Sequence, residues 1–137
     1  MVIRQADWQR DNAAIAAIRR KVFIEEQQVP EELEWDGRDE DAIHLLAYVD
    51  GIAVATARML TDGHIGRMSV LREYRGRGIG RQLLTQMIQL AQQRGLTQVH
   101  LDAQTHAIGF YEQSGFYCQG GTFMDAGIPH RHMRKSL

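Results

Sequence analysis

The stretch Arg75-Gly76-Arg77-Gly78-Ile79-Gly80 decides the fold of this chain, because it separates an apolar segment from an amphipathic one. Residues 65–71 have the composition of a strand, and residues 78–94 carry apolar side chains at helical spacing. Glycines let the backbone approach a ligand closely, and the first N–H groups of a helix lack intrahelical partners at the positive end of the macrodipole. The six residues therefore predict a cradle for a diphosphate.

The motif is short, and a glycine-rich turn before a helix is equally typical of a simple connection. It lacks the lysine of a P-loop, and its glycine spacing differs from that of a dinucleotide-binding turn. The surrounding sequence must therefore decide what the motif does.

Composition narrows the function classes. The chain has 137 residues, of which 44% are hydrophobic, and 16 basic residues balance 17 acidic ones to give a net charge of -1. This length predicts a single domain, residues 1–137, and the charge balance gives no indication of a nucleic-acid or membrane partner. Cys118 is the only cysteine, which excludes an internal disulfide. With no apolar span and no signal-peptide layout, we expect a cytoplasmic protein.

The N-terminal part alternates between strand and helix patterns. We predict a first strand over Val2 to Gln5, an amphipathic helix from Trp8 to Phe23 and a short helical segment around Glu25 to Gln28. Seven acidic residues crowd the run from Glu31 to Asp41, which is predicted to be an exposed loop.

Three strands are predicted next, over residues 42–49, 52–60 and 65–71. Asp50-Gly51 and Asp62-Gly63 suit the tight turns between them, because both residue types tolerate positive φ. An antiparallel meander therefore leads into the glycine motif.

The helix after the motif is predicted to end at Gly95, a residue suited to a left-handed C-cap. The strand Gln98 to Ala103 is reached through this helix and should run parallel to the strand before the motif. A helix with Thr105 as its N-cap and a strand pair over 116–124 and 128–133 follow. The predicted fold class is α/β, a mixed sheet with helices on both faces.

The order of motifs resembles the GNAT superfamily of acyl-CoA-dependent N-acyltransferases. Arg75-x-x-Gly78-x-Gly80 and Ala107-x-x-Phe110-Tyr111-Glu112-x-x-Gly115-Phe116 carry this resemblance. Four other segments are similar to the ElaA-type branch: Arg20-x-Val22-Phe23-x-x-Glu26-Gln27, Glu34-x-Asp36-Gly37, His44-Leu45 and Gly127-Ile128-Pro129-His130. The resemblance covers nearly the whole chain and implies a GNAT-like mixed sheet with central parallel strands that splay apart.

The resemblance also implies a site for acetyl-CoA, the acyl-donor cosubstrate. Its pyrophosphate is expected on the backbone amides of the glycine loop, formed by Arg75, Gly76, Arg77, Gly78, Ile79 and Gly80. Met68, Ser69 and Val70 are expected to pair with the pantetheine arm, and a free amide at Met68 would polarise the thioester carbonyl. Gln104 occupies a position where many relatives carry asparagine, and we expect it to contact the same arm.

Two catalytic roles follow from the same resemblance. Tyr111 aligns with the tyrosine that protonates the departing thiolate, and its alternative role is packing beside Phe110. The acceptor amine arrives as an ammonium and must lose a proton, for which Glu26 is the first candidate, with His44 and His130 behind it. Each of these three is open to a structural interpretation as well.

The prediction is an N-acetyltransferase that moves the acetyl group of acetyl-CoA to a small amine or peptide amine by direct attack in a ternary complex. The alternative from a different class is a non-catalytic acyl-CoA-binding regulatory module. No metal is expected, because His130 and His132 share a strand without a third ligand. The family suggests a homodimer through the C-terminal strands.

Overall fold

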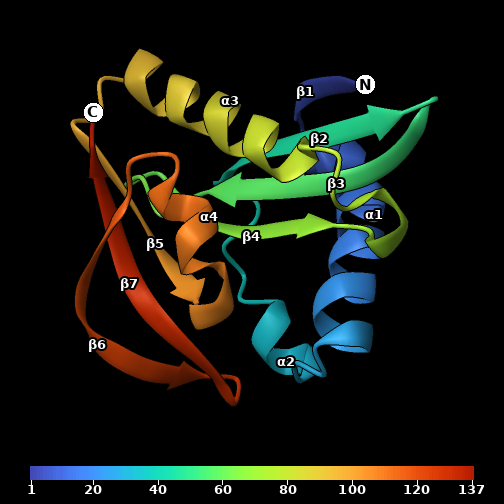
Figure 1. Ribbon diagram of the computed structural model, residues 1–137. Helices are drawn as coiled ribbons and strands as arrows, with labels where there is room; N and C mark the ends of the chain where they lie inside the picture. Colours follow the sequence, from blue (N-terminus) through green and yellow to red (C-terminus); the bar gives the residue numbers. More distant parts are fainter.

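The computed structural model describes residues 1–137, whose strands form two antiparallel sheets with helices packed against them (Figure 1). The first sheet has the strand order β1-β2-β3-β4, with the strands Val2–Ala6, Ile43–Val49, Ile52–Met59 and Ile65–Val70. The second has the order β5-β7-β6, with β5 at Gln98–Gln104, β6 at Tyr117–Asp125 and β7 at Ile128–Ser136. The helical segments are α1 (Trp8–Arg19), the π-helix η1 (Arg20–Glu26), α2 (Glu31–Glu34), η2 (Arg72–Tyr74), α3 (Ile79–Gln93), η3 (Thr105–Ala107) and α4 (Ile108–Glu112). None of these helices is long and apolar enough to cross a membrane.

The predicted meander of β2, β3 and β4 is confirmed, and so are its turns. Asp50 and Gly51 both have positive φ, at 50° and 78°, as a tight hairpin requires. Gly63 in the second turn has a φ of 92°, and a Cβ there would lie 2.9 Å from the backbone oxygen of Gln98. Only glycine fits at this position, because the turn lies directly against β5.

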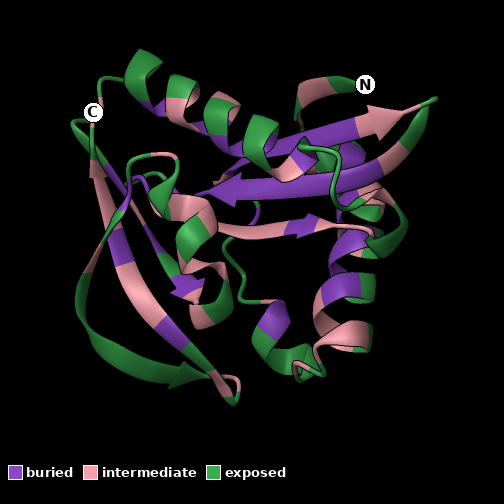
Figure 2. Ribbon diagram, in the orientation of Figure 1, coloured by how far each residue is buried: buried purple, intermediate pink, exposed green.

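Helices cover both faces of the first sheet, as predicted. Successive residues of β2 point to opposite faces: Leu45 packs in the core cluster beneath α3, and Leu46 packs against Ile15 and Ile18 of α1. Figure 2 shows the buried stripe of α3 turned toward the sheet. That stripe consists of Ile79, Leu83, Leu84, Met87 and Ala91, and Gly95 follows with the predicted left-handed φ of 78°.

The predicted pair of central parallel strands is not present as a hydrogen-bonded pair. The parallel contact at this place is one isolated bridge between His64, the residue before β4, and His100 of β5, where the His100 N–H donates to the Gly63 carbonyl at 3.1 Å. Beyond this bridge β4 pairs only with β3, and β5 pairs with β7. The mixed sheet predicted from the sequence is therefore divided into two antiparallel sheets that meet at a single point.

Two helix boundaries differ from the prediction. The first α-helix ends at Arg19 and continues as the π-helix η1, in which the Gln27 N–H donates to the Val22 carbonyl five residues earlier. The spacing of apolar residues in the sequence is compatible with both an α-helix and a π-helix, because each type can place these residues on one face. The sequence pattern therefore could not distinguish the two. Thr105 is not an N-cap either, because it begins the 3₁₀ turn η3 and α4 starts only at Ile108.

The acidic run from Glu31 to Asp41 is not the exposed loop that the sequence predicted. It contains α2, and the side chains of Glu34 and Asp39 are buried. Carboxylates can be buried only when they are paired, and the arginines that pair them come from distant parts of the chain.

Truncation of Leu84 in α3 should test this core. Leu84→Ala removes a fully buried side chain between α3 and the first sheet. We expect the free energy of unfolding to fall by about 2–5 kcal/mol, measured by denaturant titration. Gln92→Ala, on the exposed face of the same helix, is the control and should leave the free energy of unfolding within about 0.5 kcal/mol of wild type. A similar loss in both variants would contradict the assignment of this face.

Candidate active site

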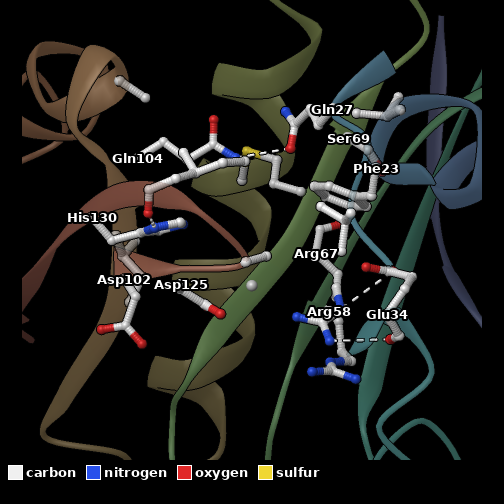
Figure 3. A pocket seen from close by; sticks show the side chains of 18 of the residues that line it. Phe23, Gln27, Glu34, Arg58, Arg67, Ser69, Asp102, Gln104, Asp125 and His130 are labelled. Carbon is white, nitrogen blue, oxygen red and sulfur yellow. Dashed lines mark hydrogen bonds and ion pairs between the residues drawn. The ribbon is translucent and has the colours of Figure 1, made fainter. Parts of the chain in front are cut away.

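A cavity of about 560 Å³ opens where the two sheets separate, a volume that suits a small-molecule ligand. One wall comes from β4 and the N-terminal helical segments, and the other comes from β5, β7 and α4 (Figure 3). Seven residues predicted for the site border this cavity: Met68, Ser69, Val70, Arg75, Gln104, Tyr111 and the candidate base His130. Glu26 and residues 76–80 lie outside its lining.

Strand β4 carries a bulge at the cavity. Thr56 pairs with Ser69 and Arg58 pairs with Gly66, so that Arg67 and Met68 together stand opposite Ala57. Arg67 has a φ of 51°, which is uncommon for a residue with a Cβ. A bulge interrupts the ladder of backbone hydrogen bonds and re-aims the strand, and here it does so at the residue predicted to face the thioester.

The glycine loop has the geometry expected of an anion cradle. Gly76 and Gly78 have φ values of 78° and 79°, and a Cβ built on either would meet no atom within 4 Å. Gly78 is the N-cap of α3, and no side chain caps this helix end. The first N–H groups of a helix of 15 residues therefore have no capping side chain, and they lie beside two residues without side chains.

The arginines of the loop have protein partners. Arg75 donates to the Val70 carbonyl at 2.9 Å and to Glu26 at 3.0 Å, and Arg77 lies over the Tyr74 ring at 5.1 Å. The loop would thus present backbone groups to a ligand, with its guanidinium groups held to the side.

Tyr111 lies in α4 with its ring packed against aromatic neighbours. Phe110 and Phe116 contact it edge to face, with ring centroids 5.0 and 6.0 Å away. Burial raises the pKa of Tyr111 to about 12, because the phenolate would be poorly solvated there. The hydroxyl therefore stays protonated across the neutral range, and Tyr111 is among the residues that border the cavity.

The end of η1 contacts both sides of the cavity mouth. Glu26 forms ion pairs with Arg75 at 3.0 Å and Arg72 at 3.4 Å. Gln27 accepts a hydrogen bond at 2.9 Å from the Gln104 side chain at the end of β5. Burial opposes ionisation of Glu26, but the hydrogen bond and charge of Arg75 lower its pKa. The predicted base is thus engaged with two cations.

The wall formed by the acidic segment is held by buried ion pairs. Arg19, which is fully buried, donates to Glu34 at 2.7 Å and to Asp39 at 2.6 Å. Arg58 of β3 donates to the same Asp39 oxygen at 3.1 Å and to both oxygens of Asp36. Although burial disfavours the charged form of Asp36, hydrogen bonds from Arg58 hold its pKa well below the usual range.

Arg67 extends this ion network to the bulge of β4. Its guanidinium donates to the Glu34 carbonyl at 3.1 Å and lies 3.3 Å from a carboxylate oxygen of Asp36. The acidic segment therefore becomes a fixed wall of the cavity rather than a solvated loop.

The opposite wall carries two carboxylates that the sequence analysis did not select, those of Asp102 and Asp125. Asp102 lies between His132, at 2.7 Å, and His64, at 3.6 Å. His64, acting against burial and together with His132, lowers the pKa of Asp102 to about 2. The sequence pattern could have predicted that Asp102 faces away from the core. Val99, Leu101 and Ala103 form the buried face of β5, so the alternating residues between them, Asp102 included, lie on the other face.

Two antiparallel sheets that diverge around a cavity, with a glycine loop opening an uncapped helix, define an acyltransferase fold of the GNAT type. The sequence profile described as "Acetyltransferase (GNAT) domain" matches residues 6–137, and the chain belongs to this family. The predicted family resemblance is thereby confirmed.

Individual relatives agree with this assignment. A putative acetyltransferase from Bacillus subtilis is 35% identical, with 98% of this chain and 96% of the relative covered. The ElaA protein of Escherichia coli is 30% identical over 90% of this chain and 86% of its own length. The crystal structure of an acyl-CoA N-acyltransferase from Pseudomonas aeruginosa matches with a TM-score of 0.88 and 31% identity, over 98% of this chain and 99% of the other.

Removal of one carboxylate from the ion network should show that it is buried and coupled. Asp39→Asn leaves Arg19 and Arg58 without the charge that they share. We expect a loss of about 3–5 kcal/mol in the free energy of unfolding, measured by denaturant titration, because a buried cation is left undercompensated. Glu31→Gln breaks the exposed pair with Arg20 and should leave the unfolding midpoint near that of wild type. Equal small effects in both variants would refute the buried network.

Proposed function

We propose that the protein is an N-acetyltransferase that moves the acetyl group of acetyl-CoA to an acceptor amine by direct attack in a ternary complex. The observation that carries this proposal is the open glycine loop at the uncapped start of α3, next to a cavity bordered by Tyr111. Membership of the GNAT family supports acyl-CoA as the donor. Residues 1–137 would act as one catalytic domain.

The donor would bind along the seam between the two sheets. The pyrophosphate would accept hydrogen bonds from backbone amides of Arg75 to Gly80, as an anion does at a helix N-terminus. The pantetheine arm would run along Met68, Ser69 and Val70, where the bulge interrupts the ladder of β4. Gln104 would reach the arm by exchanging its hydrogen bond with Gln27.

The chemistry would need one polarising group and one acid. The backbone amide of Met68, which lies in the bulge, would stabilise the negative charge that develops on the thioester oxygen. Tyr111 would donate its proton to the thiolate as the carbon–sulfur bond breaks, a role that its raised pKa supports by keeping the phenol protonated. No metal takes part in this scheme.

Carboxylates on the cavity walls support an acceptor that arrives as a cation. Asp102 and Asp125 border the cavity on the β5–β7–β6 side, and an ammonium group would be attracted to that wall. The acceptor would be a small amine or a peptide amine. The outer strand β6 is exposed along nearly its whole length, which supports the homodimer through the C-terminal strands.

Gly78 offers a matched test of the donor site. Gly78→Ala adds a methyl group at the start of α3, and Gly95→Ala adds one just after its end, at nearly the same positive φ and in equally open space. Both variants should lose roughly 1–2 kcal/mol of stability through backbone strain. Only Gly78→Ala should weaken coenzyme A binding, by at least about tenfold, or about 1.4 kcal/mol, in calorimetry. Equal affinities of the two variants for coenzyme A would contradict the proposal that the glycine loop binds the pyrophosphate.

Tyr111→Phe separates the transferase from a binding module. The assay measures thiol release from acetyl-CoA across a panel of small amines, amino acids and lysine peptides. We expect the variant to lose about 10²–10⁴-fold in kcat while keeping its affinity for acetyl-CoA, because only the proton donor is removed. Tyr117→Phe, at an exposed site on β6, is the control. Tight coenzyme A binding with no thiol release from any acceptor in the wild type would favour the regulatory module.

A further inference from the structure

We propose that His130 is the general base of the transfer reaction and removes the proton from the acceptor's ammonium group at its Nε2 atom. This inference rests on the proposed function and names the group that the proposed function leaves unassigned. Glu26 was the first candidate in the sequence, and the structure favours His130 through its position, its fixed ring and the absence of a competing partner.

The position of His130 follows from the register of β5 and β7. His130 stands directly opposite Gln104, and side chains of such a cross-strand pair project from the same face of the sheet. Gln104 reaches across the cavity to Gln27, so the imidazole beside it faces the same space. Figure 3 shows the ring of His130 next to Gln104, on the wall that also carries Asp102 and Asp125.

The ring is held in a defined orientation. Its Nδ1 atom lies 2.7 Å from the Ile128 carbonyl, which can only accept, so Nδ1 carries the hydrogen and the lone pair of the neutral ring is on Nε2. Phe123 stacks on the His130 ring with centroids 5.8 Å apart, and His130 is 8% exposed. No protein group hydrogen-bonds to Nε2, and this atom is not sealed from solvent. It is therefore open to the cavity as an acceptor.

The other candidates from the sequence are engaged elsewhere. Glu26 pairs with Arg72 and Arg75, and these cations make its carboxylate a weaker base. His44 is 1% exposed, with Nε2 2.8 Å from the Asp39 carbonyl, and does not border the cavity. Both groups are therefore held by protein partners, and neither borders the cavity.

The remaining titratable groups of the cavity are paired or unconstrained. Glu34 and Asp36 belong to the arginine network, and Asp102 is shared by His64 and His132. His106 borders the cavity but forms no hydrogen bond that would fix its ring. The charged and titratable groups that surround His130 are Asp102 and His132 two residues along the strands, Arg131 beside it in β7, Asp125 of β6 and Arg67 across the cavity.

The proton balance of the step is complete. His130 takes one proton from R–NH₃⁺, directly or through one water, and the free amine forms the C–N bond at the thioester carbonyl. As the C–S bond breaks, the sulfur receives the proton of Tyr111, and Tyr111 recovers a proton from the attacking nitrogen as the amide forms. The products are the amide and free coenzyme A thiol, and His130 returns one proton to solvent.

His130→Asn tests the proposal with little change to the fold, because the asparagine amide can still donate to the Ile128 carbonyl. We expect kcat to fall by about 10²–10⁴-fold, with the KM for acetyl-CoA and the calorimetric affinity for coenzyme A unchanged. The deficit should shrink as the pH rises toward the acceptor's own pKa, because the amine then arrives already deprotonated. His130→Gln, which places an amide near the Nε2 position, should show the same deficit and the same pH dependence.

His132→Gln is the matched control, since His132 lies two residues along the same strand but does not border the cavity. It should keep the wild-type pH profile, and Glu26→Gln should change the KM for acetyl-CoA through Arg75 rather than the pH profile. A wild-type pH profile and kcat in both His130 variants would overturn the proposal while leaving the transferase intact. If the wild type releases no thiol with any acceptor, the proposed function fails and the role of His130 fails with it.

Discussion

The backbone bridge between His64 and His100 is the constraint on which the site depends, since it is the one bridge that joins the residue leading into β4 to strand β5. Two strands paired along their full length would seal the space between them. Here β4 turns away with β3, and β5 turns away with β7, so that Met68 and Gln104 come to border one cavity from different sheets. The bulge at Arg67 and Met68 adds to this separation, because it bends β4 at the same level.

A cavity between two diverging sheets also needs a third wall, and the ion network supplies it. Arg19, Arg58 and Arg67 come from a helix and two strands, and they neutralise three carboxylates of the acidic segment. Buried ion pairs are weak sources of stability, because desolvation offsets most of the attraction. Their effect here is to fix the position of the acidic segment. The ion pairs hold this segment against β3 and β4, where it forms one wall of the cavity.

The sequence predicted those parts of the fold that depend on neighbouring residues. The stripe of α3, the turn at Asp50-Gly51 and the left-handed Gly95 follow from local spacing and backbone freedom, and each is present. The bulge at Arg67, the π-helix of η1 and the burial of Glu34 depend on partners distant in the chain, and no local pattern indicated them. The same division holds for the site. The proposed donor loop is one continuous segment, while the walls of the cavity combine residues of η1, α2, β5 and β7.

The proposed acyl transfer needs two proton-transfer groups with different properties, and the two proposed groups lie on different elements. The acid must remain protonated until the thiolate leaves, and burial among aromatic rings achieves this for Tyr111 in α4. The base must be unprotonated when the amine arrives, which requires an accessible lone pair, and His130 in β7 has one because the Ile128 carbonyl holds its other nitrogen. The two groups differ in their neighbours rather than in depth, since His130 is itself only 8% exposed. Aromatic rings surround the phenol, while a backbone carbonyl holds one nitrogen of the imidazole and leaves the other without a protein partner. The divergence of the two sheets brings residues with these different neighbours to one cavity, and this connects the separation of β4 and β5 to the proposed reaction.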